Sequence, residues 1–337
     1  MFGDSTKAFG RTFLLAHFAP AVIFVVANAT LAFWGVIPSI PTNYQRMYSD
    51  SLGVLLLIAA FACALLLALI QTTIVRLYEG YEPSILTIVA VSCLLLSLVA
   101  PYGPVPHIAQ RALAAVSAIS FALLLLHWPL KWLHRLQYWR MRRDINRLPE
   151  DDDKRGMKEY RIRRRYAPDP QKIMPTQLGN ILRAFESYAD HVYGMDSITM
   201  WFRLSAVIPK DYRDQIADAE SSVYAMLNLS FVLAVVASEV LVETPNILSP
   251  YVWPGLLAIL LSYICYRAAC SSARRDWGEY VRAAFDLYRL DLLKQLGIET
   301  GSQPFWADGE RKWWQHAQLM TFYNEPPRGD LRIVPRD

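Results

Sequence analysis

The sequence predicts an all-α, polytopic membrane protein with about six transmembrane helices and a helical cytoplasmic lobe. Three observations lead to this fold class. Hydrophobic residues make up 54% of the 337 residues, more than the roughly 45–50% of soluble domains. The excess lies in long blocks without charge, each close to the roughly 20 residues that a membrane-spanning helix needs. Most Lys and Arg residues lie between or after these blocks, as in multi-pass proteins.

The first 130 residues predict transmembrane helices one to four. Their expected ranges are about 13–36, 51–75, 84–101 and 112–130. The first range carries no charge, and His17 is its one polar exception among bulky apolar side chains. Because basic residues precede this range and Ala27-Asn28-Ala29 resembles a signal-peptide cleavage site, it stays open whether the first helix is cleaved.

The second half of the chain predicts two more spans, at about 222–242 and 251–270. Between the two groups of spans, 131–221 is expected to be a basic, helical cytoplasmic region that holds 18 Lys and Arg residues. The segment 271–337 is expected to form a cytoplasmic helix and a C-terminal tail. With six spans, both termini and every basic cluster lie in the cytoplasm, as the positive-inside rule requires.

Within the basic region the sequence predicts a helix that continues span four, followed by a solvated turn at 150–153. Thr176 is a candidate N-cap for a helix whose apolar residues recur at helical spacing. The turn Tyr193-Gly194 should end that helix, and a second helix should cover about 197–207. Long helices are expected from Pro209 into span five, and from span six to about residue 296, with Gly297 as the stop.

The segment PTQLGNILRAFESY, from Pro175, is followed by YGMDSITMWFRL and, earlier in the chain, RLYEGY spans 76–81. This pattern resembles a group of uncharacterised bacterial integral membrane proteins with a PTxLGNxLRA…YGxD…WxRL cytoplasmic segment. One departure is Phe202, where the group has a proline after the tryptophan. The resemblance implies a bacterial cytoplasmic (inner) membrane protein with N- and C-termini inside, and it implies no reaction.

Glu239 is the only ionised side chain in the fifth span, and Glu243 lies one turn further out. Ionisable groups at membrane depth are functional candidates by default. We expect an intramembrane ion pair with Arg111 or His107, at the start of span four. Two alternatives stay open: Glu239 reaches interfacial water, or it lines a pathway and accepts protons.

Basic residues after span four are expected to contact anionic lipids of the inner leaflet, where each cation contributes about 1 kcal/mol. The candidates are Arg140, Arg142, Arg143, Arg147, Arg163, Arg164 and Arg165. Nucleic acid is an unlikely partner. The acidic residues Glu186, Asp190 and Asp196, with His191, suggest either a metal site or a solvated helix end, and the second interpretation is favoured.

The sequence lacks the HExxH, GxSxG, GxxxxGK[ST] and GxGxxG motifs, so we expect no cofactor, no catalytic residues and no structural metal. The predicted function is that of a non-enzymatic bacterial membrane protein whose cytoplasmic lobe binds a protein partner, as a sensor, scaffold or membrane effector. An oligomeric channel or transporter is the first alternative, and a homo-oligomer is open in either case. A membrane-embedded enzyme is the second alternative.

Overall fold

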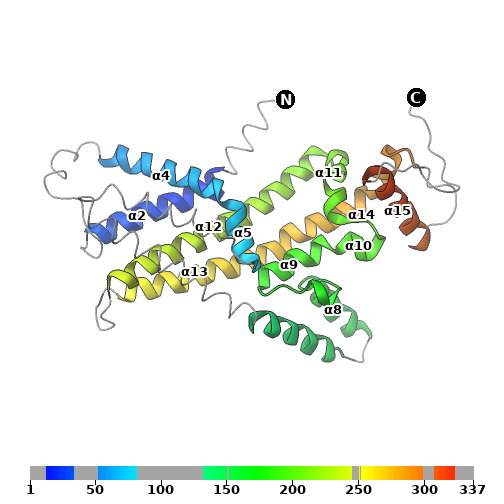
Figure 1. Cartoon of the computed structure of the whole chain (residues 1–337), viewed down its shortest axis with the longest axis horizontal. Coiled ribbons are helices and arrows are strands. Elements are labelled where there is room, and N and C mark those ends of the chain that lie inside the picture. Colours follow the sequence, from blue (N-terminus) through cyan, green and yellow to red (C-terminus); the bar gives the residue numbers. More distant parts are fainter. Residues whose placement is uncertain are drawn as a thin grey trace. The chain divides into compact units, whose positions relative to one another are not determined.

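The computed structural model describes residues 13–33, 52–81, 132–149, 152–244, 250, 252–298 and 307–322. Every regular element in these ranges is a helix (Figure 1). Three helical stretches are long and apolar enough to cross a membrane: Leu14–Leu31, Lys210–Leu241 and Val252–Gln295. A bent pair, Leu56–Leu69 with Gln71–Glu79, makes a fourth if it is one span. The spans predicted at 84–101 and 112–130 lie outside the described residues.

The chain divides into two compact units. Unit 1 comprises residues 1–133 and 220–271, and unit 2 comprises 134–219 and 272–337. Two long helical stretches contribute to both units. The first is α12 (Lys210–Glu243), and the second is α13 (Val252–Ser272) followed directly by the π-helical turn η4 (Ala273–Trp277) and α14 (Gly278–Gln295). The long helices predicted from Pro209 and from span six are thereby confirmed.

Unit 1 begins with a π-helical turn, η1 (Leu14–Phe18), that continues into α2 (Ala19–Phe33). Helix α4 (Leu52–Leu69) packs along α2. Several small side chains, such as Ala21, Ala60 and Ala64, are buried beside larger ones such as Phe24 and Leu67, whereas Leu57 and Ile58 are exposed. Large apolar side chains on the outside and small ones between helices are the pattern of a bundle packed within lipid.

The second predicted span, 51–75, is not one straight helix. It bends by 56° between α4 and α5 (Gln71–Glu79), at Ile70, whose φ of −96° and ψ of 7° leave the helical region. The polar run that starts with Gln71 follows directly. The side chain of Gln71 is engaged by a distant helix, as described below, and this tertiary contact accounts for a break that the hydropathy profile does not predict.

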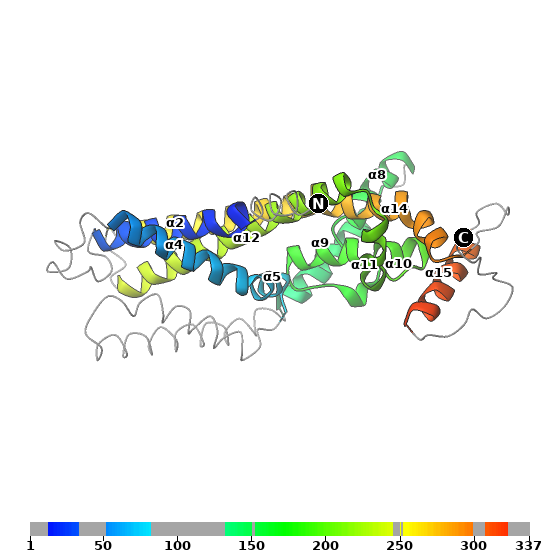
Figure 2. The same ribbon diagram turned by 90° about the horizontal axis from the view of Figure 1, so that it is seen from above.

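Helices α2 and α12 run parallel in unit 1 (Figure 2). The Ala16 carbonyl contacts Asn228, and Asn28 contacts Glu239 further along both helices. The two contacts are separated by nearly equal numbers of residues on each helix, and about 11 residues correspond to three helical turns. Helix α13 returns antiparallel to α12 (Figure 1), as two spans that follow each other in the chain require.

Unit 2 is built around α14. Helices α9 (Gln177–Glu186), α10 (Tyr188–Tyr193) and α11 (Ser197–Val207) pack on it, and α15 (Ala307–Phe322) packs on α10. A helix at 132–146, α8 (Asp152–Arg163) and the short 3-10 helix η3 (Pro170–Lys172) complete the unit. The prediction of a turn at 150–153 is wrong for residues 152 and 153, because α8 begins at Asp152. Acidic side chains favour the first turn of a helix through the helix dipole.

Aromatic pairs form the centre of this core. Phe185 of α9 packs against Trp277 with ring centroids 5.1 Å apart, and Trp201 of α11 packs against Phe285 of α14 at 5.8 Å. The apolar residues predicted to line α9 are buried, namely Leu178, Ile181, Leu182 and Phe185. Such pairs add to the apolar burial that holds helices together.

The predicted capping residues are confirmed, but the single helix predicted from Thr176 to Gly194 is wrong, because it divides at Ser187 into α9 and α10. The hydroxyl of Thr176 accepts a hydrogen bond from the backbone N–H of Gly179 at 3.0 Å, so Thr176 is the N-cap of α9. Gly194 ends α10 with a φ of 72°, and Gly297 follows α14 with a φ of 76°. Both lie in the left-handed region that glycine adopts at little cost.

Candidate functional site

The most unusual group of side chains in unit 1 is a buried polar cluster on three helices. Asn228 of α12 is fully buried. Its Nδ2 donates hydrogen bonds to the Ala16 carbonyl and to Gln71 Oε1, both at 2.7 Å. His17 is hydrogen-bonded to the side chain of Gln71 and its ring stacks on Phe13 at 5.7 Å. The cluster therefore joins η1, α5 and α12 through polar contacts.

Two irregularities of the backbone place these groups together. Within η1 the helix widens, and the Ala19 N–H bonds to the Leu14 carbonyl instead of to the residue four positions before it. Such π-turns interrupt the regular hydrogen-bond ladder and are frequent at functional sites. The Ala16 carbonyl accepts from Asn228 at this interruption. The break at Ile70 brings Gln71 to the same place.

A second polar group in unit 1 is fully paired. The Tyr78 hydroxyl donates to Ser230 Oγ at 2.8 Å. Ser230 Oγ donates to the Ser262 carbonyl at 2.9 Å, and Ser262 Oγ donates to the Ser230 carbonyl at 2.8 Å. The Tyr78 ring also stacks on Tyr266, with centroids 5.6 Å apart. These contacts fasten α5, α12 and α13 in the way that interhelical serines do in membrane bundles.

Glu239 lies on α12 and shares a side-chain hydrogen bond with Asn28 of α2. Its other oxygen, Oε2, is buried and has no hydrogen-bond partner among the described residues. Arg111 and His107, the expected partners, lie outside the described residues, as does the side chain of Glu243. The ion pair stays a prediction, and Asn28 is a partner that the sequence did not suggest.

The seven arginines expected at the inner leaflet divide into two groups. Arg143 and Arg165 lie 3.7 Å from the Asp144 carboxylate, and Arg163 lies 2.6 Å from Glu159. Arg164 makes an ion pair with Glu279 at 2.7 Å and donates to the Arg274 carbonyl within η4. The remaining three, Arg140, Arg142 and Arg147, are exposed, and none of them pairs with a carboxylate in the described part of the chain.

A series of charged and aromatic side chains in mutual contact follows one face of α14. Glu279 Oε1 contacts both Arg164 and the buried Arg282 at 2.7 Å. Its Oε2 accepts from the Tyr160 hydroxyl at 3.2 Å, and the Arg282 guanidinium lies 5.9 Å from the centre of the Tyr188 ring. Because a buried arginine such as Arg282 needs paired acceptors, this arrangement indicates that Glu279 neutralises Arg282 and that Arg164 links the end of α8 to α14.

The series of side-chain contacts along α14 continues at Asp286. Its Oδ1 accepts the hydroxyls of Tyr188 at 2.9 Å and Tyr193 at 2.6 Å. Burial and the neighbouring Asp286 raise the pKa of Tyr188 to about 12, and burial together with the bond to Asp286 raises the pKa of Tyr193 as well. Both phenols therefore remain protonated donors at neutral pH.

The last contact of this series joins α14 to α15. Arg289 stacks on the Tyr193 ring, with its guanidinium carbon 4.0 Å from the ring centre, and its Nε lies 2.7 Å from Glu310 Oε1. The same oxygen accepts from Trp314 Nε1 at 3.2 Å. Glu310 and Trp314 are both buried, so this oxygen is where α15 is fastened to α14.

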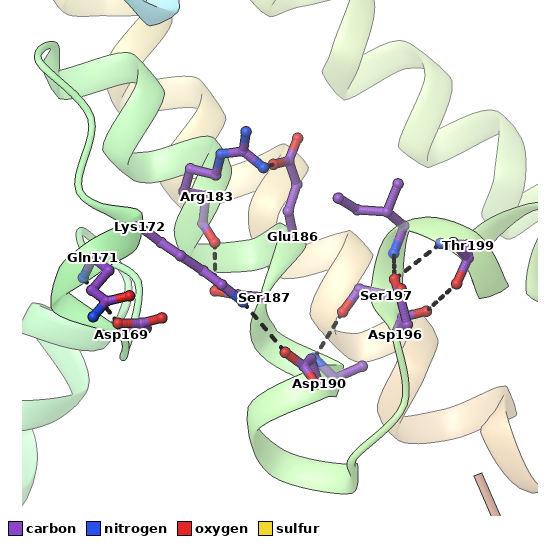
Figure 3. Close-up of polar contacts among 12 residues, drawn as sticks. Asp169, Gln171, Lys172, Arg183, Glu186, Ser187, Asp190, Asp196, Ser197 and Thr199 are labelled. Carbon is purple, nitrogen blue, oxygen red and sulfur yellow. Dashed lines mark hydrogen bonds and ion pairs between the residues drawn. The ribbon is translucent and has the colours of Figure 1, made fainter. Parts of the chain in front are cut away.

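The acidic residues considered as a metal site do not converge (Figure 3). Glu186 pairs with Arg183 at 3.3 Å, and Asp190 lies 3.5 Å from Lys172. Asp196 accepts the backbone N–H groups of Ile198 and Thr199 as the N-cap of α11. Burial raises the pKa of Glu186. In the described part of the chain, no three His, Cys, Asp or Glu side chains are grouped as metal ligands.

The segment from Pro175 that resembles the uncharacterised bacterial group has a structural role in this protein. Asn180 is buried, and its side-chain oxygen accepts from the Met174 N–H at 2.9 Å. Its Nδ2 donates to the carbonyls of Met174 at 2.8 Å and Thr176 at 2.6 Å. The Asn and Gly positions of the pattern thus fix the beginning and end of short helices.

Comparison with protein-family models, with curated proteins and with solved structures found no match to this chain. The functional argument therefore depends on the residues themselves. The sequence analysis identified His17 as a polar exception in the first span, and it missed Asn228. The available signal was an uncharged but strongly polar amide in the middle of the fifth span, which deserves the same scrutiny as Glu239 because unpaired amides are costly in lipid.

Proposed function

We propose that this protein is a non-enzymatic, multi-pass protein of the bacterial cytoplasmic membrane whose helical unit 2 binds a cytoplasmic protein partner. The observation that carries the proposal is a stripe of exposed apolar side chains on α11. Phe202 is 80% exposed and Ile198 is 56% exposed, and Ala206 continues the stripe at the same spacing. A large aromatic residue exposed beside other apolar side chains is typical of protein interaction sites.

The packing of α11 keeps this stripe of side chains exposed on the surface of unit 2. Met200 and Leu204 on the opposite side of the helix are completely buried, and Trp201 packs on Phe285 of α14. Rotating the helix to hide Phe202 would expose both buried residues. The stripe recurs every four residues, so the partner surface that fits it is the apolar side of one amphipathic helix.

The partner proposal is tested by placing a photoreactive phenylalanine analogue at Phe202 in cells. We expect one discrete protein adduct that Ile198→Asp abolishes. The matched control places the same probe at Met157, an exposed apolar residue on α8, where no such adduct should form. An adduct with phospholipid, or none at all, would overturn the partner role of α11, and an adduct of twice the chain mass would identify a second copy instead.

The parallel course of α2 and α12 supports a topology with an odd number of spans between them, and the six-span topology has three. The cytoplasmic side of both termini is supported by the excess of Lys and Arg in residues 131–221. Cysteine labelling tests it. Positions near Asp152 and Gly194 should react only from the cytoplasmic side, and the loops around Tyr44, Gly103 and Asn246 only from outside. Labelling of a cysteine at Asp152 from outside would refute the topology.

The helix at 132–146 supports contact with anionic inner-leaflet lipids. Trp132, Trp139 and Ile145 are exposed on the same helix as the exposed Arg140 and Arg142. Exposed aromatic residues among arginines suit the boundary between headgroups and acyl chains. In nanodiscs, replacing both arginines by Gln should reduce quenching of these tryptophans by brominated anionic lipids, and unchanged quenching would remove the lipid role.

An oligomeric channel or transporter is the second candidate, and the buried polar cluster of His17, Gln71 and Asn228 favours it. Polar side chains at membrane depth mark ion and solute pathways in many transporters. Ion-flux and dye-release measurements on proteoliposomes separate the candidates. A flux that Asn228→Leu abolishes would support transport, and the absence of any flux would leave the partner function as the one that the geometry supports.

A further inference from the structure

The helix at 132–146 and the segment that follows α8 pack against each other in unit 2 through a small core of their own. Met141, Tyr166 and Ile173 are buried together, and Ile162 packs on them. Close packing of this kind fixes the backbone on both sides of the contact. The charged residues that neighbour Met141 and Tyr166 in the sequence are therefore held near one another.

Two arginines beside this core approach one carboxylate without a hydrogen bond to it. Arg143 Nη2 lies 3.7 Å from Asp144 Oδ1, and Arg165 Nη1 lies 3.7 Å from Asp144 Oδ2. Hydrogen bonds from a guanidinium to a carboxylate measure about 2.7–2.9 Å. The Nε atoms of both arginines are buried and have no partner among the described residues, whereas each side chain as a whole is 41% exposed. Both guanidiniums therefore have unused donors and are open to solvent.

The Tyr166 hydroxyl lies within the electric field of these charges. Burial raises the pKa of Tyr166 and Asp144 raises it further, whereas three guanidiniums lower it, those of Arg165, Arg140 and Arg143. Among the described residues, three cations and one carboxylate thus act on one hydroxyl, which leaves a surplus of two positive charges. Because its pKa is raised, the hydroxyl stays protonated at neutral pH and is a further hydrogen-bond donor.

A phosphate group complements this arrangement. It carries up to about two negative charges and three acceptor oxygens, and the guanidinium fork matches its geometry. A carboxylate ligand would neutralise only one of the surplus charges. The two guanidiniums flank the two oxygens of Asp144, which are about 2.2 Å apart, so the guanidinium nitrogens lie at most about 10 Å from each other. A phosphate that accepts from two arginines at about 2.8 Å spans up to about 8 Å, so rotation of the side chains alone brings both to it.

We propose that Arg143 and Arg165, with Tyr166 beside them, bind one phosphate group, carried either by a soluble molecule or by the headgroup of an anionic lipid. Asp144 competes with the phosphate for the two guanidiniums. The site differs from the inner-leaflet contact of Arg140 and Arg142 proposed above, because two arginines on one fixed core hold a single phosphate. Its lipid form rests on that proposed contact, and its soluble form does not.

The first measurement is isothermal titration of the full-length protein, in nanodiscs of phosphatidylcholine, with inorganic phosphate at constant ionic strength. Replacing Arg143 and Arg165 together by Gln should weaken binding at least about tenfold, because two charged hydrogen bonds are lost. The matched control replaces Arg147 and Arg161 by Gln. These two are exposed arginines near the same two helices, and their loss should change the affinity by about twofold or less.

A second pair of variants changes the affinity in the opposite direction and does not remove the arginines. Asp144→Asn removes the competing charge and should tighten phosphate binding about threefold. Its control is Glu159→Gln, which removes a carboxylate that pairs with Arg163 at 2.6 Å and should leave the affinity unchanged. Binding that responds equally to the two substitutions would show a general effect of charge and would overturn the site.

Native mass spectrometry of the protein released from nanodiscs of phosphatidylcholine and phosphatidic acid distinguishes the two sources of phosphate. One phosphatidic acid that the native chain and the control pair retain, but the Arg143 and Arg165 variant loses, identifies a lipid headgroup. Binding of inorganic phosphate identifies a site open to soluble phosphates, and it supports the site even if brominated lipids do not quench the tryptophans. Neither titration heat nor a retained lipid, or an equal effect of the two arginine pairs, would overturn the proposal.

Discussion

The oxygen that fastens α15 to α14 gives the sharpest prediction for unit 2. Glu310 Oε1 contacts Arg289 Nε at 2.7 Å and Trp314 Nε1 at 3.2 Å. Glu310→Gln keeps the shape of the side chain and an acceptor for Trp314, but it removes the charge that neutralises Arg289. Because Glu310 and Trp314 are buried, water does not replace the lost partner.

The expected loss of stability depends on the contacts that Arg289 keeps in the variant. Removing one partner of a buried ion pair costs about 3–5 kcal/mol. Arg289 keeps its stacking on Tyr193 at 4.0 Å and its bond to the Asp286 carbonyl, so we expect a smaller loss of about 2 kcal/mol. That corresponds to about a 30-fold increase in the population of states in which α15 is detached.

Hydrogen exchange of the α15 amides, followed by mass spectrometry on the full-length protein, measures this population. The control is Asp291→Asn, which breaks the exposed pair with Lys294 at 3.2 Å, whose side chains are 52% and 71% exposed. The control should change exchange by about twofold or less. Exchange in α15 that is equal in the two variants would refute the argument that Glu310 fastens this helix.

Three further predictions concern unit 2, each measured by thermal or chemical unfolding. Gly194→Ala should lower stability by about 1–2 kcal/mol, since φ is 72° there, whereas Gly156→Ala, in open space within α8, should raise it by about 0.5–1 kcal/mol; equal effects would contradict the left-handed turn. Asn180→Ala should cost about 3 kcal/mol because three backbone groups lose their partner, and a stability loss below that of an exposed Asn→Ala variant would contradict this argument. The pKa of Tyr188 is raised to about 12, so its contribution is complete below the ordinary pKa of 10 and disappears as the pH rises through 12. The stability advantage of the native chain over Tyr188→Phe should therefore shrink between these values, and a constant difference would show that burial and the neighbouring Asp286 do not raise this pKa.

Local signals in the sequence predicted the short helices of unit 2 well. Thr176 caps the helix that begins beside it, and the bounds of α11 follow from Asp196 and the spacing of Met200 and Leu204, because each of these interactions spans only a few residues. The long helix from Pro209 was predictable for the same reason, since its apolar residues are continuous with span five.

The interactions that were missed join residues far apart in the chain. The break at Ile70 has no proline or glycine to announce it, and Gln71 meets Asn228 across 157 residues. Arg164 belongs to a run of three arginines for which the sequence predicts contact with anionic lipid, and the sequence does not predict its ion pair with Glu279. Neither the composition nor the periodicity of a segment carries information about a partner that arrives from another part of the fold.

The bond between the Ala16 carbonyl and Asn228 spans 212 residues, and this separation has a consequence for biogenesis. At a synthesis rate of about 5–20 residues per second, α2 enters the bilayer roughly 10–40 seconds before α12 leaves the ribosome. During that interval the π-turn and Gln71 have no partner from α12 within lipid, where unpaired backbone groups are costly. The pair of helices α2 and α4 is therefore an intermediate of insertion whose unpaired polar groups need the insertion machinery or water as temporary hydrogen-bond partners. A chain that stops before α12 should be recognised and degraded by the quality-control proteases of the membrane.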